Sequence, residues 1–216
     1  QPFDPVRLAL GGPALTVFSQ ELKKDEAFGR VNLSLSESGT AIFQSLADAA
    51  SELVWYDRNG RELGRVPAAG LSEPALSPDG RLLAATSDDG GNGRTTIRVL
   101  DLARGVSTPL PAGGQEMMPT WSPDGVHVAY RSGTWPRYAI SQVRADVSAP
   151  PEVLLEGPKM MPNTYTPDGR ALLYMRLDRV ISHLARYDLA QHTSQDLIQG
   201  SEFQLSPDGR WLAGLS

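Results

Sequence analysis

The sequence predicts an all-β fold, a β-propeller whose blades are four-stranded antiparallel sheets. The string Ser-Pro-Asp-Gly, or Thr-Pro-Asp-Gly in one copy, occurs four times and ends at Gly80, Gly125, Gly169 and Gly209. A weaker copy ends at Gly39, so that successive glycines are 41, 45, 44 and 40 residues apart. Repeats of about 40–50 residues that carry regular turn signals are typical of propeller blades, because each repeat is one four-stranded unit.

The repeated string is expected to be a turn that joins the first two strands of a blade. Proline fixes φ at about −65°, the aspartate can accept bonds from nearby backbone N–H groups, and glycine tolerates positive φ. An alternative interpretation, a cluster of the aspartates, fails because each aspartate belongs to a different blade. The structural turn residues are therefore Pro78, Asp79, Gly80, Pro123, Asp124, Gly125, Pro167, Asp168, Gly169, Pro207, Asp208 and Gly209.

Short β-rich segments flank each turn. Apolar segments precede the turns at 74–76, 119–121, 164–165 and 203–205, and β-rich runs follow them at 82–86, 126–130, 171–175 and 211–215. The second half of each blade is marked by an aspartate before a further turn, at positions 57, 101, 146 and 188. Asn59-Gly60 is the strongest single hairpin signal in the chain. Short runs between Gly and Pro residues favour strands over buried helices.

The two ends of the chain do not match whole blades. Residues 6–10 and 14–18 resemble the outer two strands of a blade, and residues 203–216 resemble the inner two. The sequence therefore predicts four complete blades and two half blades, in a single propeller domain or propeller fragment over residues 1–216. The two halves could pair and close a five-bladed ring, or the chain could be a piece of a larger propeller.

Composition narrows the class of partner. The chain has 20 basic and 25 acidic residues and a net charge of −5, whereas nucleic-acid binding normally leaves a basic surface. The absence of cysteine excludes disulfides, thiol catalysis and Cys-ligated zinc. No apolar run approaches the roughly 20 residues of a membrane helix. We therefore expect no nucleic-acid partner, no direct membrane insertion of this segment, and no cofactor or metal.

The repeat resembles that of TolB-type β-propellers. The run from Pro119 to Gly125, Pro-Thr-Trp-Ser-Pro-Asp-Gly, followed by Val128-Ala129-Tyr130, matches the motif of those blades closely. The order of segments resembles most closely the propeller attached to bacterial eukaryotic-like serine/threonine kinases, and this resemblance covers essentially the whole chain. The resemblance implies a sensory or scaffolding module with a periplasmic or otherwise extracytoplasmic location, although a cytoplasmic one stays open. The third repeat departs from the pattern at 131–143, where the common acidic or glycine-rich hairpin is missing.

The sequence offers no catalytic motif, so the chain is expected not to be an enzyme. It lacks a glycine-rich nucleotide loop, H-R-D and D-F-G, the parts of a kinase. The nearest string to a hydrolase nucleophile elbow, at 70–74, lacks the second glycine and is expected to lead into a strand. His127, His183 and His192 fall in expected strands or hairpin turns. The alternative function is an accessory, substrate-gating propeller of a prolyl-oligopeptidase-like serine peptidase.

Two similar loops between blades, 114–119 and 157–162, are the first candidates for binding a protein or peptide partner. They contain four of the five methionines, and methionine adapts to varied partners. The candidate residues are Glu116, Met117, Met118, Lys159, Met160 and Met161. The alternative interpretation is that one methionine of each pair packs between blades.

A third candidate for partner binding, Trp135, lies in a loop expected on the same face of the propeller. It would serve as a contact anchor or cover a blade edge. The segment 88–93 faintly resembles a calcium loop, but it lacks the required acidic residues and is expected to be a hairpin loop. Binding is therefore expected on the face that carries the variable loops, opposite the Ser-Pro-Asp-Gly turns.

Overall fold

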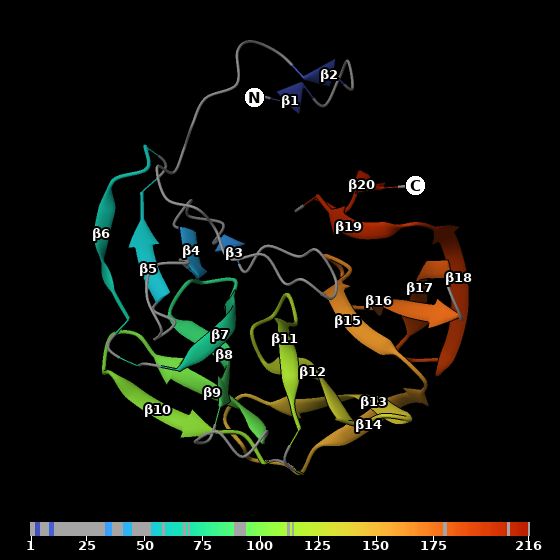
Figure 1. The fold of residues 1–216 in the computed structure, drawn as a ribbon, viewed down its shortest axis with the longest axis horizontal. Coiled ribbons are helices and arrows are strands. Elements are labelled where there is room, and N and C mark those ends of the chain that lie inside the picture. The colour runs from blue at the N-terminus through green and yellow to red at the C-terminus, as the bar shows by residue number, and fades with distance from the viewer. Residues whose placement is uncertain are drawn as a thin grey trace.

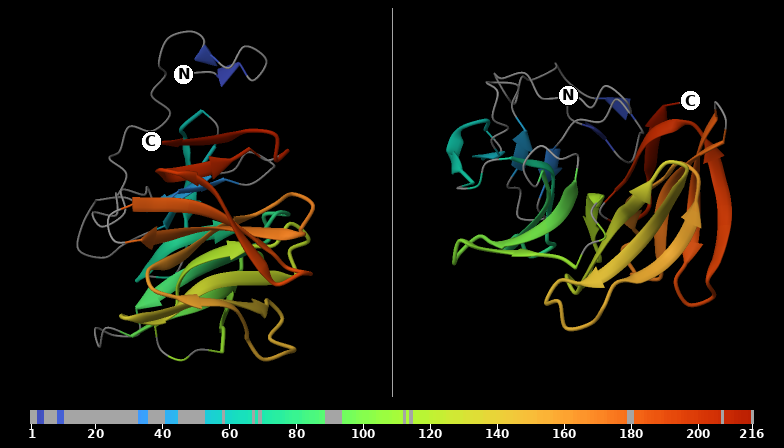
Figure 2. Two further views of the ribbon diagram at one scale, coloured as in Figure 1. Left: turned by 90° about the vertical axis from the view of Figure 1, so that its right-hand side faces the viewer. Right: turned by 60° about the horizontal axis from the view of Figure 1, so that its bottom comes forward.

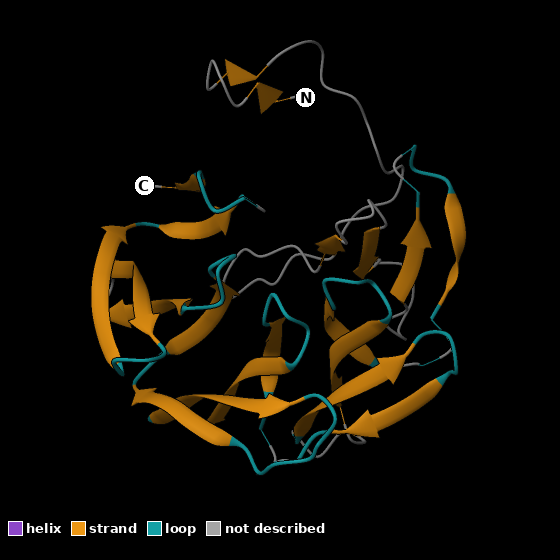
Figure 3. Ribbon diagram, turned by 180° about the vertical axis from the view of Figure 1, so that it is seen from behind, coloured by secondary structure: helices purple, strands orange, loops and turns teal. Residues whose placement is uncertain are grey.

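The computed structural model describes residues 3–4, 9–10, 33–35, 41–44, 53–57, 59–66, 68, 70–88, 94–111, 113, 115–178, 181–206 and 208–215. All of its regular elements in these ranges are strands, and Figure 3 shows strands and loops without a helix there. No helix in these ranges is long and apolar enough to cross a membrane. The expected all-β class is confirmed.

Sixteen of the strands form four antiparallel sheets in which each strand pairs with its neighbour in sequence. The first blade contains β3 (Leu33–Leu35), β4 (Ala41–Gln44), β5 (Leu53–Tyr56) and β6 (Glu62–Arg65). The second contains β7 (Leu71–Leu76), β8 (Leu82–Asp88), β9 (Thr95–Asp101) and β10 (Val106–Pro109). The third contains β11 (Met117–Trp121), β12 (His127–Thr134), β13 (Arg137–Arg144) and β14 (Glu152–Gly157). The fourth contains β15 (Met160–Tyr165), β16 (Ala171–Asp178), β17 (Ile181–Asp188) and β18 (Thr193–Gln199).

Two shorter sheets stand at the ends of the described chain. β1 (Phe3–Asp4) pairs with β2 (Ala9–Leu10), and β19 (Ser201–Leu205) pairs with β20 (Leu212–Leu215). The prediction of four complete blades is thus confirmed, and a two-stranded sheet lies at each end of the described chain. At the N-terminal end residues 9–10 pair with 3–4, whereas the sequence predicted a pairing of 6–10 with 14–18. In the described residues the two short sheets do not pair with each other, so strand pairing does not close the ring there. The strand expected at 14–18 lies outside the described residues.

The blades surround a common centre. The first strands of successive blades contact one another in the order β3, β7, β11, β15 and β19, and these strands face the middle of the molecule (Figure 1). Figure 2 shows that successive sheets are turned relative to one another about this centre. A sheet that has a blade on each side therefore buries both of its faces against those neighbours.

The Ser-Pro-Asp-Gly strings form the predicted turns. Gly125 has φ of 69°, and the glycines of the other three copies have φ between 68° and 71°. In the third blade the Asp124 carboxylate accepts bonds from the Ser122 hydroxyl at 2.5 Å and from the Val126 N–H at 2.9 Å. The same pair of bonds recurs at Asp79, Asp168 and Asp208. Pro207 lies outside the described residues.

The hydrophobic core consists of clusters between neighbouring blades. Ile97 and Val99 of the second blade pack with Trp121 and Val128 of the third. The Trp121 indole N–H donates to the Ala75 carbonyl oxygen at 2.9 Å, which joins β11 to the preceding blade. Ala129 and Ile140 of the third blade pack in turn with residues of the fourth. The sequence motif therefore places its tryptophan at an interface between blades, as its apolar ring and single donor require.

Candidate functional site

A hairpin of the third blade projects on the side opposite the Ser-Pro-Asp-Gly turns. β12 and β13 pair up to Thr134 and Arg137, and Trp135 and Pro136 form the tip, joined by a cis peptide bond. The Trp135 side chain is 62% exposed. Gly133 has φ of 87°, and a Cβ there would lie 2.6 Å from the Arg137 carbonyl oxygen. The local sequence thus requires glycine at this position to close the hairpin that displays the tryptophan.

The structure brings two of the predicted binding residues together. The Lys159 ammonium lies 5.6 Å from the centroid of the Trp135 ring, and Lys159 is exposed in the connection between β14 and β15. An exposed cation–π contact of this kind contributes about 0.5–1 kcal/mol. Trp135 and Lys159 therefore form one surface feature, called here the Trp135 surface.

The other predicted residues are mostly buried. Glu116, Met118, Met160 and Met161 are buried, and Met117 is partly buried. The assignment of the four methionines to surface loops is wrong, because β11 and β15 begin earlier than expected and already include them. Glu116 does lie outside the strands, just before β11, but it is buried.

Pro119 and Pro162 lie at register shifts of these strands, where a missing N–H is tolerated, and do not end them. Met118 and Met161 pack together with Leu173 and Phe203, while Met160 joins the cluster between the third and fourth blades. The packing interpretation of the methionines is the one the structure supports.

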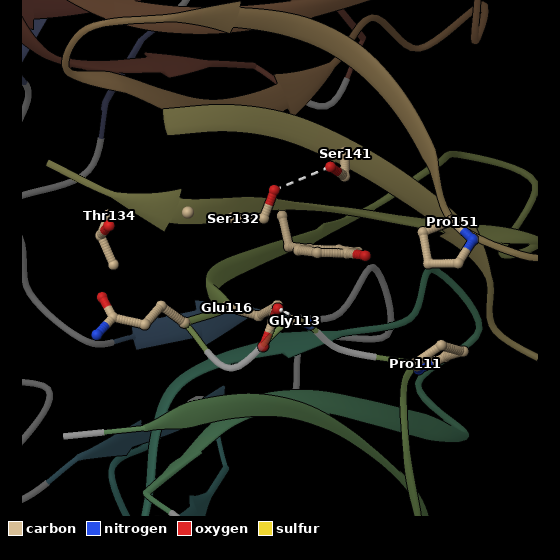
Figure 4. A pocket seen from close by; sticks show the side chains of 10 residues that line it. Pro111, Gly113, Glu116, Ser132, Thr134, Ser141 and Pro151 are labelled. Atoms are coloured by element: carbon tan, nitrogen blue, oxygen red, sulfur yellow. Dashed lines mark hydrogen bonds between the residues drawn. The ribbon is translucent and has the colours of Figure 1, made fainter. Parts of the chain in front are cut away.

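A pocket of about 600 Å³ lies beside the hairpin, between the second and third blades (Figure 4). We call it the Tyr130 pocket. Its lining residues come from β12 and β13, from the segment after β10, and from the residue before β14: Pro111, Gly113, Gln115, Glu116, Tyr130, Ser132, Gly133, Thr134, Ser141 and Pro151. None of these ten is lysine, arginine or histidine. Sequence reasoning found only Glu116 of this set, since the others come from segments that meet only in the fold.

Buried polar groups fix the chemistry of the Tyr130 pocket. The Glu116 carboxylate accepts a bond from the Gly113 N–H at 2.6 Å, and Ser132 and Ser141 share a hydroxyl–hydroxyl bond of 3.0 Å. Burial, followed by the negative charge of Glu116, raises the pKa of Tyr130 to about 12. The Tyr130 hydroxyl is therefore protonated at neutral pH. The pocket can donate and accept hydrogen bonds, and Glu116 is the acidic residue among the ten that line it.

A second pocket, of about 460 Å³, lies against the third blade and shares Gly133 with the Tyr130 pocket. We call it the Tyr138 pocket; it is lined by Gly133, Pro136, Arg137, Tyr138, Ala139, Glu156, Gly157 and Pro158. The Arg131 guanidinium lies 4.8 Å from the centroid of the Tyr138 ring and contacts the sulfur of Met117. The Tyr138 pocket therefore contains both a basic and an acidic residue, Arg137 and Glu156.

A serine, an aspartate and a histidine do meet at the Ser-Pro-Asp-Gly turn of the third blade, where a pocket of about 510 Å³ opens. The Ser122 hydroxyl donates to the Asp124 carboxylate at 2.5 Å and accepts from the backbone N–H of His127 at 2.8 Å. A nucleophilic serine instead needs its proton taken by an imidazole. The serine here holds the turn together, and its aspartate partner is one of four equivalent turn residues.

The string at 70–74, compared above with a nucleophile elbow, has a structural role. Ser72 lies in β7, and the neighbouring Glu73 accepts bonds from the Met118 N–H at 2.8 Å and the Thr86 hydroxyl at 2.7 Å. Glu73 thus joins the second blade to the third. Among the described residues no three His, Asp or Glu side chains gather as a possible metal site. The segment 89–93, which contains most of the calcium-loop string, lies outside the described residues.

Comparisons with known proteins identify the fold. No protein-family model matches the chain, and no curated protein matches it. A putative TolB from Agrobacterium tumefaciens superposes with a TM-score of 0.66 at 18% identity, over 76% of this chain and 62% of that one. TolB from Acinetobacter baumannii gives a TM-score of 0.66 at 23% identity, over 82% of this chain and 47% of that one. The chain has a TolB-like β-propeller fold.

The same fold relates the chain to a protease. The β-propeller domain of the Trilobed protease from Pyrococcus furiosus superposes with a TM-score of 0.53 at 12% identity, over 81% of this chain and 58% of that domain. The TolB-like chain spans 62% and 47% of the two TolB structures and 58% of the protease propeller, less than two thirds of each. At these identities the likeness shows the fold alone.

Proposed function

We propose that this chain is a non-catalytic, protein-binding propeller and that the Trp135 surface is its contact region. The single observation that carries the proposal is the large, 62% exposed side chain of Trp135 at the tip of a glycine-closed hairpin. Tryptophan is the residue most enriched at the energetic centres of protein interfaces, because it buries a large area at a small entropic cost. The adjacent Lys159 adds a charge that selects among partners.

The finer parts of the proposal rest on resemblance. The order of sequence segments supports a sensory or scaffolding role beside a bacterial receptor-type serine/threonine kinase, outside the cytoplasm. The likeness to a protease propeller favours a second candidate, an accessory propeller that gates substrate entry to a peptidase. The domain encoded next to this segment in its gene separates the two: a kinase domain supports the first candidate, and a hydrolase domain supports the second.

The contact region is tested with two matched tryptophan variants. Trp135 lies on the variable-loop side, whereas Trp211, which is 37% exposed, follows the last Asp-Gly turn on the opposite side. Purified wild-type chain, Trp135→Ala and Trp211→Ala are immobilised and compared for retention of the partner that the wild type captures. We expect a loss of at least about tenfold in affinity for Trp135→Ala, the scale of an interface anchor, and little change for Trp211→Ala. Loss confined to Trp211→Ala contradicts the proposal.

A further inference from the structure

The Tyr130 pocket has features of a binding site that the proposed partner contact does not use. We propose that this pocket binds a primary ammonium group, carried either by a small alkylamine or by the lysine side chain of a peptide. The proposal rests on a fixed carboxylate, an unpartnered hydroxyl and a lining without any cation.

The carboxylate in the pocket wall is held in place. The backbone N–H of Glu116 donates to the Thr95 carbonyl oxygen at 3.1 Å, and the carboxylate itself accepts from the Gly113 N–H at 2.6 Å. The Glu116 side chain is only 3% exposed. Because the carboxylate is shielded from bulk water, it attracts a cation more strongly than an exposed carboxylate does. Its fixed position also means that a ligand does not have to order it on binding.

The Tyr130 hydroxyl supplies a group that a ligand can satisfy. The side chain is 2% exposed, and its ring packs in the core between the second and third blades. In the described part of the chain the hydroxyl has no hydrogen-bond partner, yet it is not one of the atoms sealed from solvent. The hydroxyl therefore opens onto the pocket. Leaving a nearly buried hydroxyl unpaired costs free energy that a bound partner recovers.

The lining selects a donor-rich cation. The carboxylate of Glu116 and the hydroxyls of Tyr130, Ser132, Thr134 and Ser141 can all accept hydrogen bonds. An ammonium group has three donors and no acceptor, so it matches these groups, whereas an anion would meet the acidic Glu116 in a lining that contains no lysine, arginine or histidine. Pro111 and Pro151 line the same pocket and offer apolar surface to an alkyl stem.

The test uses n-butylammonium as the probe and n-butanol as its neutral isostere. Each is titrated into the isotope-labelled 216-residue chain, and amide shifts of Ser132, Gly133 and Ser141 are followed by NMR. We expect saturable shifts with n-butylammonium, an affinity for n-butanol lower by about tenfold or more, and a similar loss in Glu116→Gln, the scale of one charge-assisted hydrogen bond. Glu156→Gln is the matched control, because Glu156 is an exposed carboxylate of the neighbouring Tyr138 pocket.

A further variant and a further probe complete the test. Tyr130→Phe keeps the ring but removes the hydroxyl, and we expect it to weaken n-butylammonium binding by about fivefold, one neutral hydrogen bond. This variant serves in place of Glu116→Gln if circular dichroism shows that the latter does not fold. Nα-acetyl-lysine methylamide distinguishes the source, since tighter binding than n-butylammonium assigns the pocket to a lysine side chain and weaker binding assigns it to free amines.

Equal affinity for n-butanol and n-butylammonium overturns the proposal. So does an unchanged affinity in Tyr130→Phe, or an equal loss in Glu156→Gln. Trp135→Ala is expected to leave n-butylammonium binding unchanged. This variant therefore distinguishes a failure of the Tyr130 pocket proposal from a failure of the proposed partner contact at the Trp135 surface.

Discussion

At the scale of single residues, two glycines with similar backbone angles have different reasons to be glycine. Gly125 has φ of 69°, but a Cβ there would only touch the Pro78 ring at 3.8 Å. Gly133 has φ of 87°, and a Cβ there would meet the Arg137 carbonyl oxygen at 2.6 Å, well inside van der Waals contact. The first position requires a left-handed conformation only, whereas the second also requires empty space.

This difference predicts two unequal losses of stability. Gly125→Ala is expected to lower the free energy of unfolding by roughly 1–2 kcal/mol, the cost of a Cβ in the left-handed region. Gly133→Ala is expected to cost roughly 2–4 kcal/mol, because backbone must also move. Urea unfolding of both variants checks the order. A smaller loss for Gly133→Ala than for Gly125→Ala would show that the hairpin tip relaxes freely.

From the turn aspartates we predict that the free energy of unfolding decreases at acid pH. The Ser122 hydroxyl, followed by the Val126 N–H, holds the pKa of Asp124 below its ordinary value, and hydrogen bonds act in the same direction on Asp79, Asp168 and Asp208. The unfolded-state pKa is about 3.9, so this stabilisation is complete above about pH 5 and is lost as the pH falls through the lower folded-state pKa.

Asp124→Asn removes one of these titrating groups and keeps an oxygen acceptor in the turn. We expect its free energy of unfolding to fall less steeply than that of the wild type between about pH 4 and pH 2. Denaturant unfolding at a series of pH values measures both slopes. A steeper decline in the variant would contradict the assigned direction of the pKa shift.

At the scale of elements, the blades are joined by side chains that leave one sheet and bond to the next. Trp121 of β11 packs in one cluster with Val99 and Val128 and donates to the Ala75 carbonyl of β7. Glu73 of β7 crosses in the opposite direction and accepts from the Met118 N–H of β11. The interface between the second and third blades is therefore fixed by both apolar packing and hydrogen bonds.

Trp121→Ala is expected to cost roughly 3–5 kcal/mol, the loss for removing a buried aromatic ring. The loss includes an unpaired carbonyl at Ala75. Trp135→Ala is the matched control, and because Trp135 is largely exposed we expect a change below about 1 kcal/mol. Thermal and urea unfolding of the two variants provide the comparison, and equal losses would place Trp121 outside the packed interface.

At the scale of the whole molecule, the sheet of β19 and β20 pairs with no other sheet of the described residues. In the described residues β20 pairs only with β19, and all four residues of β20 are exposed, with Leu215 at 58%. Exposed apolar strand edges promote association between chains, and a lysine on such an edge opposes it.

We therefore expect Leu215→Lys to reduce concentration-dependent self-association of the 216-residue chain without lowering its melting temperature. Analytical ultracentrifugation across a concentration series measures the effect. A charge change away from any strand edge, Gln191→Lys in the exposed turn between β17 and β18, controls for net charge. Equal reductions in the two variants would assign the effect to net charge and not to the edge.

The spacing of the Ser-Pro-Asp-Gly strings was enough to predict the all-β class, the four complete blades and the positive φ of Gly125. These features depend on local chemistry, because proline, aspartate and glycine fix a turn through contacts within a few residues of one another. The prediction that the methionines of the loops 114–119 and 157–162 form a binding surface was wrong. Both loops were expected to extend to a proline, Pro119 or Pro162, but these prolines lie within strands.

Only the tertiary structure decided which residues from distant parts of the sequence lie next to one another. Strand bulges place both prolines inside β11 and β15, so Met118, Met160 and Met161 became packing residues between blades. The contact of Trp135 with Lys159, and the meeting of Glu116 with Tyr130 and Ser141, join residues that are separated by up to about 25 positions in the chain. The sequence by itself determined the repeating unit, whose turns are local. The pockets depend on how neighbouring strands and blades pack, which no short stretch of sequence encodes.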